Sequence, residues 1–352
     1  MRIRADVPLI PDFGFLRGYH STVPDLARAI ELLKQGRLVA FPTETVYGLG
    51  ADATNAAAID RIYETKGRPS TNPLIVHVAS EEIARRYVGN WPAVASRLAR
   101  QFWPGPLTIV LSKRGAVIPD AATAGLATVA VRVPNHPLAL ELLREFDGPL
   151  AAPSANRSTR VSPTTASHVL EEFPDSAAAG GAADREPALV LDGGACTVGI
   201  ESTVLDLTTP TPTVLRPGHV TVAQIEEIVG APVVVAGGHL ARETPAASPG
   251  LQAIHYAPRT IAYRFETSQR PLVPGHDIGL VALSPLVGHK EWGRIVAMSA
   301  DPVEYAQHFY DVLRRLDAMG LPALYIEFPP DQPEWSAIRD RITRATRPYR
   351  GT

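Results

Sequence analysis

Short apolar runs alternate with amphipathic segments over residues 22–218. In the amphipathic segments, apolar residues repeat at three- and four-residue spacing, as on one face of a helix. The predicted helices run from after Thr22 to Gly36, and over 56–63, 94–102 and 137–146. The predicted buried strands are 38–41, 74–78, 107–111 and 128–133, followed by short strands and turns within 189–194, 203–207 and 214–218. Strands that alternate with helices, with hairpin-like pairs late in the run, predict an α/β domain with a mixed sheet.

Cap and turn residues refine this pattern at three places. Asn55 is a suitable N-cap for the second helix. Ser162 is predicted to cap another helix, with Pro163 in its first turn. Residues 42–50 form a hydroxyl-rich, glycine-punctuated turn where a strand ends. Ligands usually bind at such strand ends in α/β sheets.

The periodicity weakens at 231–260 and then resumes. Glycine and proline residues in this interval indicate a linker, although His255 and Tyr256 offer stacking and hydrogen bonds that a passive tether does not need. Strands at 278–283, 294–298 and 323–328 and helices at 303–319 and 335–345 predict a smaller, Rossmann-like α/β domain. The predicted division is an N-terminal extension (1–21), a main domain (22–218), a linker (219–260) and a second domain (261–352).

Two groups in the second domain receive structural interpretations. The apolar face of the 303–319 helix, with Tyr305, Phe309 and Leu316, is predicted to be core. The C-terminal arginines are interpreted as a solvated helix face, with contact to tRNA or a partner left open. They are Arg339, Arg341, Arg344, Arg347 and Arg350.

Composition excludes several classes of protein. The net charge is −2, so a strongly basic nucleic-acid binder is not indicated. The single cysteine, Cys196, excludes an internal disulfide and a multi-cysteine zinc site. No apolar run reaches the ~20 residues of a membrane span, and the first residues lack a signal-peptide core, so a cytoplasmic protein is expected.

Polar side chains gather at predicted strand ends and the adjoining turns. The clusters are Thr43/Thr45, Lys66/Arg68/Asn72, His77, Ser154/Asn156/Ser162 and Ser202/Arg216. If the sheet brings them together, they form a pocket of cations and hydroxyls without a placed nucleophile or acid–base pair. Such a pocket suits phosphoryl or nucleotidyl transfer, in which the protein positions the reactants and neutralises developing charge.

Each signal also has a structural interpretation. The 67–74 loop can be a solvated surface loop, and His77 can be a core histidine with one hydrogen bond. Ser154 and Asn156 can shape a turn after Pro153. Arg132 is harder to assign to structure alone, because a buried strand arginine requires a ligand or a fixed carboxylate.

Several blocks make the chain similar to a known family. They are PTETVYGLG (42–50), RPSTNPL (68–74), WPGPLT (103–108), APSAN (152–156) and GIEST (199–203). The Lys66-x-Arg68 and Ser154-x-Asn156 pairs match a signature tetrad, and the chain resembles the threonylcarbamoyl-AMP synthases, the YrdC-like family. SPG (248–250), HYAP (255–258) and the second domain resemble its long, two-domain branch.

The resemblance implies a fold and a reaction. The fold is a YrdC-like twisted mixed sheet with helices, plus the smaller C-terminal α/β domain. The reaction is nucleotidyl transfer, in which L-threonine, bicarbonate or CO2, and ATP with Mg²⁺ give threonylcarbamoyl-AMP and pyrophosphate. The product serves threonylcarbamoyladenosine modification of tRNA after transient hand-over to a tRNA threonylcarbamoyl transferase.

The resemblance also implies roles for residues. It assigns the signature and catalytic role to Lys66, Arg68, Ser154 and Asn156. It assigns ATP binding to Arg68, Asn72, Thr128, Ser154, Ser162, Arg216, His255 and Tyr256. It assigns threonine binding to Thr45, His77, Arg132, Ala152 and Ser202. No metal bound by protein ligands is expected, and whether Lys66 faces the carbamate or the triphosphate stays open.

Two other functions remain to be separated from this one. A double-stranded RNA-binding module could use a concave basic surface, although the near-neutral charge argues against it. A carbamoyl-adenylate maker of hydrogenase maturation would carry additional zinc-finger and acylphosphatase-like regions, for which this chain lacks the cysteines and the length.

Overall fold

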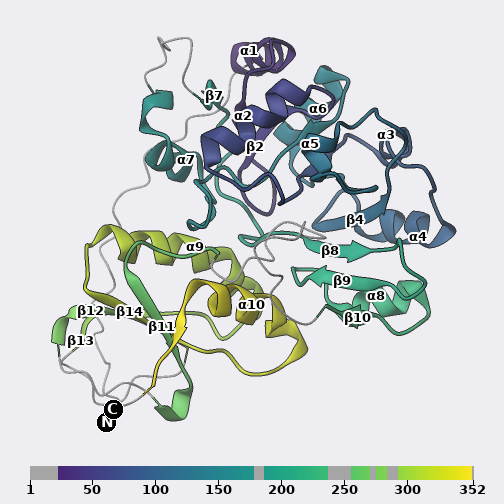
Figure 1. Cartoon of the computed structure of the whole chain (residues 1–352). Helices are drawn as coiled ribbons and strands as arrows, with labels where there is room; N and C mark the ends of the chain where they lie inside the picture. Colours follow the sequence, from purple (N-terminus) through teal and green to yellow (C-terminus); the bar gives the residue numbers. More distant parts are fainter. Residues whose placement is uncertain (1–22, 178–185, 237–254, 270–274, 284–291, 351–352) are drawn as a thin grey trace.

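The computed structural model describes residues 23–177, 186–236, 255–269, 275–283 and 292–350 (Figure 1). The expected N-terminal extension lies outside these residues. So do most of the alanine- and glycine-rich loop at 176–187 and the Ser-Pro-Gly motif at 248–250. No helix in the described part of the chain has the length and apolar character that crossing a membrane requires.

The main domain is built on a mixed sheet, which the described residues form with ten strands in the order β10-β9-β8-β4-β5-β3-β6-β2-β1-β7. The strands are β1 (Val39–Phe41), β2 (Gly48–Asp52), β3 (Ile75–His77), β4 (Leu107–Ser112), β5 (Thr128–Arg132), β6 (Leu150–Ala151), β7 (Leu189–Val190), β8 (Thr203–Asp206), β9 (Thr213–Arg216) and β10 (Val234–Val235). Strand β3 runs parallel to β5 and antiparallel to β6, so the ends of three strands meet near His77 and Arg132.

Helices cover both faces of this sheet. They are α1 (Val23–Lys34), α2 (Ala56–Lys66), α3 (Glu81–Ala84), α4 (Ala93–Phe102), α5 (Asp120–Thr123), α6 (Pro137–Phe146), α7 (Ala166–Glu172) and α8 (Val222–Val229), with a 3-10 turn at Pro174–Ala177. Strand β1 shows how the sequence divides between the faces. Val39 and Phe41 pack with α1 and α6, whereas Leu38 and Ala40 belong to the opposite core with α2. This alternation is the two-residue period of a strand buried on both sides.

The second domain contains a parallel sheet of five strands in the described residues, in the order β13-β12-β14-β11-β15. The strands are β11 (Ile261–Phe265), β12 (Gly275–Ala282), β13 (Trp292–Ala297), β14 (Ala323–Glu327) and β15 (Arg347–Pro348). The helices are α9 (Pro302–Ala318) and α10 (Ser336–Ala345), with 3-10 turns at Thr267–Gln269 and Pro333–Trp335. Tyr305, Phe309 and Leu316 of α9 are fully buried, which confirms that this face is core.

Local signals predicted most of these elements, and two predictions need correction. Asn55 caps α2 as predicted, accepting a hydrogen bond from the backbone N–H of Ala58. Ser162 is not an N-cap, because α7 begins later and Thr165 caps it. The predicted linker begins at residue 219, but secondary structure of the main domain continues beyond this residue. Helix α8 follows there, and β10 pairs with β9 of the main sheet.

The two domains share an apolar contact. In Figure 1, α9 lies along the side of the second sheet that faces the main domain. Val46, Val161 and Ile200 of the main domain pack into the core that the second domain builds around α9 and α10. Gly199 allows this approach: its φ is +78°, and a Cβ there would lie 2.5 Å from the carbonyl oxygen of Ala306.

Candidate active site

A cavity lies where the strand ends of the main sheet meet the linker. Ten of the predicted site residues line it: Thr45, Arg68, His77, Arg132, Ala152, Ser154, Ser202, Arg216, His255 and Tyr256. The cavity encloses about 40 Å³, which is room for only a few water molecules. The predicted clusters therefore converge, and His255 and Tyr256 of the linker line the same cavity.

The 67–74 loop is solvated in part, with Gly67, Pro69 and Ser70 exposed, but it contributes Arg68 to the cavity. Gly67 ends α2 in the left-handed conformation, and Arg68 turns inward, with 8% of its surface exposed. Its guanidinium donates to the carbonyl oxygens of Asn72 (3.2 Å) and Pro73 (3.0 Å). Burial lowers the pKa of Arg68 to about 10, so it stays charged at neutral pH. Arg68 has no carboxylate partner in the described part of the chain, so its charge suits an anionic ligand.

Lys66 joins the two halves of the signature without lining the cavity. Its ammonium donates to the carbonyl oxygen of Ser154 (2.5 Å) and to that of Asn156. The Asn156 side chain in turn donates to the carbonyl oxygens of Arg157 and Arg160. Burial, followed by the neighbouring Arg68 charge, holds the pKa of Lys66 well below its ordinary value. In this structure Lys66 and Asn156 thus shape the loop that presents Ser154.

Arg132 enters the cavity from the end of β5. Its guanidinium lies 2.8 Å from a carboxylate oxygen of Glu44 and donates to Thr45 Oγ1 at 2.9 Å. Thr45 Oγ1 lies 2.9 Å from Thr43 Oγ1, and Thr43 bonds back to its own turn at Val46. A fixed carboxylate therefore meets Arg132, as a buried strand arginine requires. Thr43 is the turn former of the threonine pair, and Thr45 contacts the arginine.

His77 is neutral in this environment. It is buried at the end of β3, and its ring meets Phe41 edge-on with centroids 6.2 Å apart. Burial, followed by the charge of Arg132, lowers the pKa of His77 to about 3. Its Nδ1 has no hydrogen-bond partner among the described residues. His77 is one of the residues that line the cavity, so its ring borders the space for a ligand.

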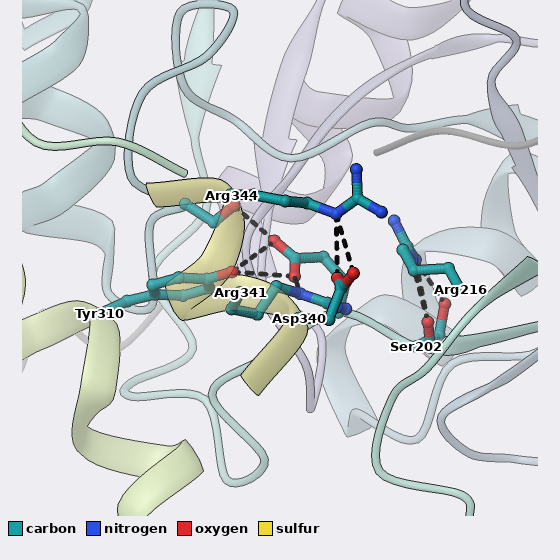
Figure 2. A network of polar contacts seen from close by, with 8 residues as sticks. Ser202, Arg216, Tyr310, Asp340, Arg341 and Arg344 are labelled. Atoms are coloured by element: carbon teal, nitrogen blue, oxygen red, sulfur yellow. Dashed lines mark hydrogen bonds and ion pairs between the residues drawn. The ribbon is translucent and has the colours of Figure 1, made fainter. Parts of the chain in front are cut away.

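The opposite wall is formed by the turn that precedes β8. Arg216 donates to the carbonyl oxygen of Ser202 at 3.0 Å and to its hydroxyl at 3.1 Å (Figure 2). Ser202 Oγ also lies 2.8 Å from Thr108 Oγ1. These contacts fix both the hydroxyl and the cation at one position of the wall.

Three other predicted residues lie outside the lining. Asn72 is buried in the 67–74 loop, and its side-chain oxygen lacks a partner in the described structure. Thr128 is the first residue of β5, opposite Ser112. Ser162 is fully buried and donates to a carboxylate oxygen of Glu201 at 2.6 Å.

The interpretation as a solvated face was wrong for two of the five C-terminal arginines, Arg341 and Arg344, whereas Arg347 and Arg350 are exposed as predicted. Arg341 has no exposed surface, and Arg344 is 7% exposed. Arg341 donates to Glu201 at 2.8 Å and to Asp340 at 2.7 Å, and Arg344 also donates to Asp340 (Figure 2). The physical reason is that α10 packs against the main domain, so its charged side is an interface.

The second domain also contacts the linker residues in the cavity. The backbone N–H of His255 donates to the carbonyl oxygen of Arg344 at 3.2 Å. The Tyr256 ring stacks on Tyr310 with centroids 5.9 Å apart, and the Arg341 guanidinium lies 5.1 Å from the same ring. Tyr256 has a φ of +61°, an unusual value for a residue with a side chain.

Sequence reasoning missed four residues of the site: Glu44, Glu201, Tyr310 and Arg341. Glu44 and Glu201 stand inside the blocks PTETVYGLG and GIEST, and a charged residue in an otherwise apolar or hydroxyl-rich block was the available signal. Tyr310 and Arg341 gave none, because each resembles an ordinary helix residue and its partner is more than 100 positions away.

Together, the fold and cavity define an α/β protein with a buried site of arginines and hydroxyls for anionic ligands. A family model described as telomere recombination, Sua5/YciO/YrdC, matches residues 31–218. A second, described as the threonylcarbamoyl-AMP synthase C-terminal domain, matches residues 220–346. The chain belongs to the threonylcarbamoyl-AMP synthase family, and to the branch that carries both domains.

Relatives and solved structures agree over nearly the whole chain. Threonylcarbamoyl-AMP synthase of Bacillus subtilis is 39% identical over 92% of this chain and 93% of its own length. The protein of that name from Pyrococcus abyssi is 37% identical over 90% of this chain and 93% of its own length. The structure of P. abyssi Sua5 complexed with L-threonine is 35% identical, with a TM-score of 0.81 over 92% of this chain and 96% of that chain.

Proposed function

We propose that this protein is an L-threonylcarbamoyladenylate synthase and therefore a nucleotidyltransferase. It makes threonylcarbamoyl-AMP and pyrophosphate from L-threonine, bicarbonate or CO2, and ATP. The observation that carries the proposal is the convergence of Arg68, Arg132 and Arg216 with hydroxyl side chains on one cavity. A relative that is 35% identical over most of the chain has been solved with L-threonine, and nothing among the relatives favours the RNA-binding alternative.

The chemistry needs charge neutralisation more than proton transfer by the protein. The threonine amine captures CO2 as a carbamate, whose oxygen attacks the α-phosphorus of ATP, and pyrophosphate leaves. Negative charge builds on the transferring and departing phosphates, and fixed cations in a dry site stabilise it strongly. Mg²⁺ enters as the complex with ATP, because the cavity carboxylate Glu201 is already held by Arg341.

The geometry suggests how the two substrates divide the cavity. Arg132, Thr45, His77, Ala152 and Ser202 form the threonine side. The Arg132 fork is suited to the threonine carboxylate. Thr45 Oγ1 and His77 lie beside it as hydrogen-bonding groups for the amine and the hydroxyl.

We assign the ATP side to Arg68, Ser154, Arg216, His255 and Tyr256, which line the cavity, and to Asn72, Thr128 and Ser162, which lie outside the lining. Lys66 and Asn156 position the Ser154 loop through the contacts described above. His255 and Tyr256 are buried and line this side, and we infer that they shift to admit the nucleotide. Once they close over the bound nucleotide, they exclude water from a product that hydrolyses readily.

The product has to reach a second enzyme. We propose that it passes transiently to a tRNA threonylcarbamoyl transferase for threonylcarbamoyladenosine formation. The reaction is placed in the cytoplasm, where ATP and tRNA are available. A direct tRNA contact is not part of the proposal.

The test is pyrophosphate release by the purified protein with MgATP, bicarbonate and L-threonine, with the adenylate identified by mass spectrometry. Arg68→Ala is expected to abolish turnover and to leave the circular dichroism spectrum unchanged. L-serine is the control for side-chain selection. No threonine-dependent pyrophosphate release from the unmodified protein, or near-normal turnover by Arg68→Ala, would contradict the proposal.

A further inference from the structure

The Glu201 carboxylate lies in the wall of the catalytic cavity, yet two of the three side chains that donate to it among the described residues come from the second domain. Ser162 donates to it from the main domain at 2.6 Å. Tyr310 of α9 donates at 3.0 Å, and Arg341 of α10 donates at 2.8 Å. The main domain alone therefore cannot complete the coordination of a charged group of its own cavity.

Tyr310 and Arg341 also contact the linker residue that occupies the cavity. The Tyr310 ring stacks on the Tyr256 ring. The Arg341 guanidinium lies 5.1 Å from the centroid of the Tyr256 ring. In Figure 2, Tyr310, Arg341 and Asp340 of the second domain lie on one side of the polar network, and Ser202 and Arg216 of the main domain lie on the other. The same two side chains thus fix one element of the wall and one element of the linker.

The charge of Glu201 depends on these neighbours. A buried carboxylate without partners would take up a proton, because burial penalises its charged form. Burial raises the pKa of Glu201, but the charges of Arg341 and Arg216 and the donated hydrogen bonds outweigh it and lower the pKa to about 2. Glu201 is consequently an anion beside Arg216 throughout the neutral range.

We propose that Tyr310 and Arg341 are positioning residues of the active site, through which the second domain holds Glu201 as a fixed anion that orders Ser162 and Arg216 on the ATP side. This inference rests on the proposed function. It assigns the second domain a direct part in nucleotide binding rather than a separate activity. It also explains why a fully buried arginine is present on a helix that looks solvated in the sequence.

The first test compares Tyr310→Phe with Tyr305→Phe. Both residues are fully buried on α9, but the Tyr305 hydroxyl has no partner in the described structure, whereas the Tyr310 hydroxyl binds Glu201. Tyr310→Phe keeps the ring and its stacking on Tyr256 and removes only the hydrogen bond. We expect it to raise the KM for ATP about 3- to 10-fold, the effect of one hydrogen bond, with the KM for threonine within about 2-fold.

Tyr305→Phe is expected to behave like the unmodified protein in both constants. Thermal unfolding of the two variants separates a loss of folding from a change in the site. Equal ATP KM values for Tyr310→Phe and Tyr305→Phe would overturn the inference, and so would equal rises in the KM for ATP and for threonine in Tyr310→Phe.

The second test is the pH dependence of Arg341→Met. The other charged and titratable groups that face Glu201 are Arg216, Asp340, Tyr310, Tyr256 and His255. Without Arg341, burial is less opposed and the pKa of Glu201 rises. The ratio of the ATP KM of Arg341→Met to that of the unmodified protein should then increase at least 3-fold from pH 9 to pH 6. Arg341→Lys keeps the charge, so the ratio of its ATP KM to that of the unmodified protein should not change between pH 9 and pH 6.

An ATP KM for Arg341→Met equal to that of the unmodified protein at every pH would overturn the role of Arg341 in the site. If Arg341→Met does not fold, the comparison of Arg341→Lys with Tyr310→Phe still decides the matter, because the inference requires a flat profile for the first and a raised ATP KM for the second.

Calorimetric titration with MgATP separates this inference from the proposed function. If the unmodified protein binds ATP but releases no pyrophosphate, the proposed reaction fails. Tyr310→Phe should still bind ATP more weakly than Tyr305→Phe in that case. If the unmodified protein makes the adenylate and the two variants bind ATP equally, only the inference fails.

Discussion

Two buried arginine–carboxylate pairs lie at the catalytic cavity, and they differ in which member of the pair faces it. Arg132 and Glu44 approach to 2.8 Å within the main domain, with both side chains 4% exposed. Arg341 and Glu201 approach to the same distance across the two domains, with side chains 0% and 8% exposed. In the first pair the arginine lines the cavity, whereas in the second the carboxylate does.

The two pairs therefore contribute opposite charges to the cavity wall: a cation from the first pair and an anion from the second. Arg132 faces the ligand, so a substrate carboxylate can share it with Glu44. Arg341 lies behind Glu201 and reaches the ligand only through it. One pair therefore binds, and the other orients, which is why their substitutions should differ in kind as well as in size.

The largest expected effect is on stability, from breaking the interdomain pair. Arg341→Met leaves Glu201 buried and less compensated, and we expect it to reduce the free energy of unfolding by ~3–5 kcal/mol. Arg339→Met is the matched control on the same helix. Arg339 is partly exposed and contacts Phe328 and Asp331 at the surface, so its loss should cost no more than ~1 kcal/mol.

Urea unfolding of both variants measures this difference. The double variant Glu201→Gln/Arg341→Met should be less destabilised than the sum of its single variants, because the second change removes a group that the first left unpaired. Equal midpoints for Arg341→Met and Arg339→Met would contradict the assignment of a buried pair.

These two pairs also show what a sequence can predict. Helix and strand periodicity is a local property, so it predicted most of the elements and an α/β sheet in each domain, although it missed β2 and β11. Arg132 was detectable because it interrupts an apolar strand, where a charge needs a partner. Arg341 was not, because charged residues every three or four positions on α10 are typical of a solvated face.

Local cap signals failed for a related reason. Ser162 followed by Pro163 has the pattern of a helix start, but Pro163 uses its carbonyl oxygen to accept the N–H of Tyr47, and the helix begins after Thr165. The hydroxyl of Ser162 is directed to Glu201 instead. Which of these outcomes occurs depends on segments more than 35 residues away, and no local pattern carries that information.

The next effect in size concerns the pair that faces the ligand. Arg132→Lys keeps the charge but loses the planar fork that holds Thr45 and Glu44 together. We expect the KM for threonine to rise about 10- to 100-fold, with the KM for ATP within about 3-fold, in steady-state pyrophosphate release.

Arg68→Lys serves as the reciprocal variant. It should raise the KM for ATP and leave the threonine constant nearly unchanged, because Arg68 lies on the other wall, among loop carbonyls. A larger ATP effect for Arg132→Lys than for Arg68→Lys would show that the two sides of the cavity are assigned the wrong way round.

The smallest expected effect is on the pH dependence of stability, and it compares a histidine of the main domain with a histidine of the linker. His77 lies in a strand and His255 in the linker, and burial lowers the pKa of each to about 3. The unfolded histidines bind protons near pH 6.5, so the unfolded state holds more protons between pH 3 and 6.5 and stability falls on acidification. Each histidine should change the free energy of unfolding by about 1.4 kcal/mol per pH unit, or roughly 2 kcal/mol between pH 6.5 and 5.

His77→Asn should remove its share of this pH dependence, measured by urea unfolding, because β3 cannot expose His77 without opening the sheet. His255→Asn should remove an equal share only if the linker stays in the cavity at pH 5. A smaller share would show that the linker leaves before the domain unfolds, and an unchanged slope in His77→Asn would contradict the burial of a neutral histidine beside Arg132.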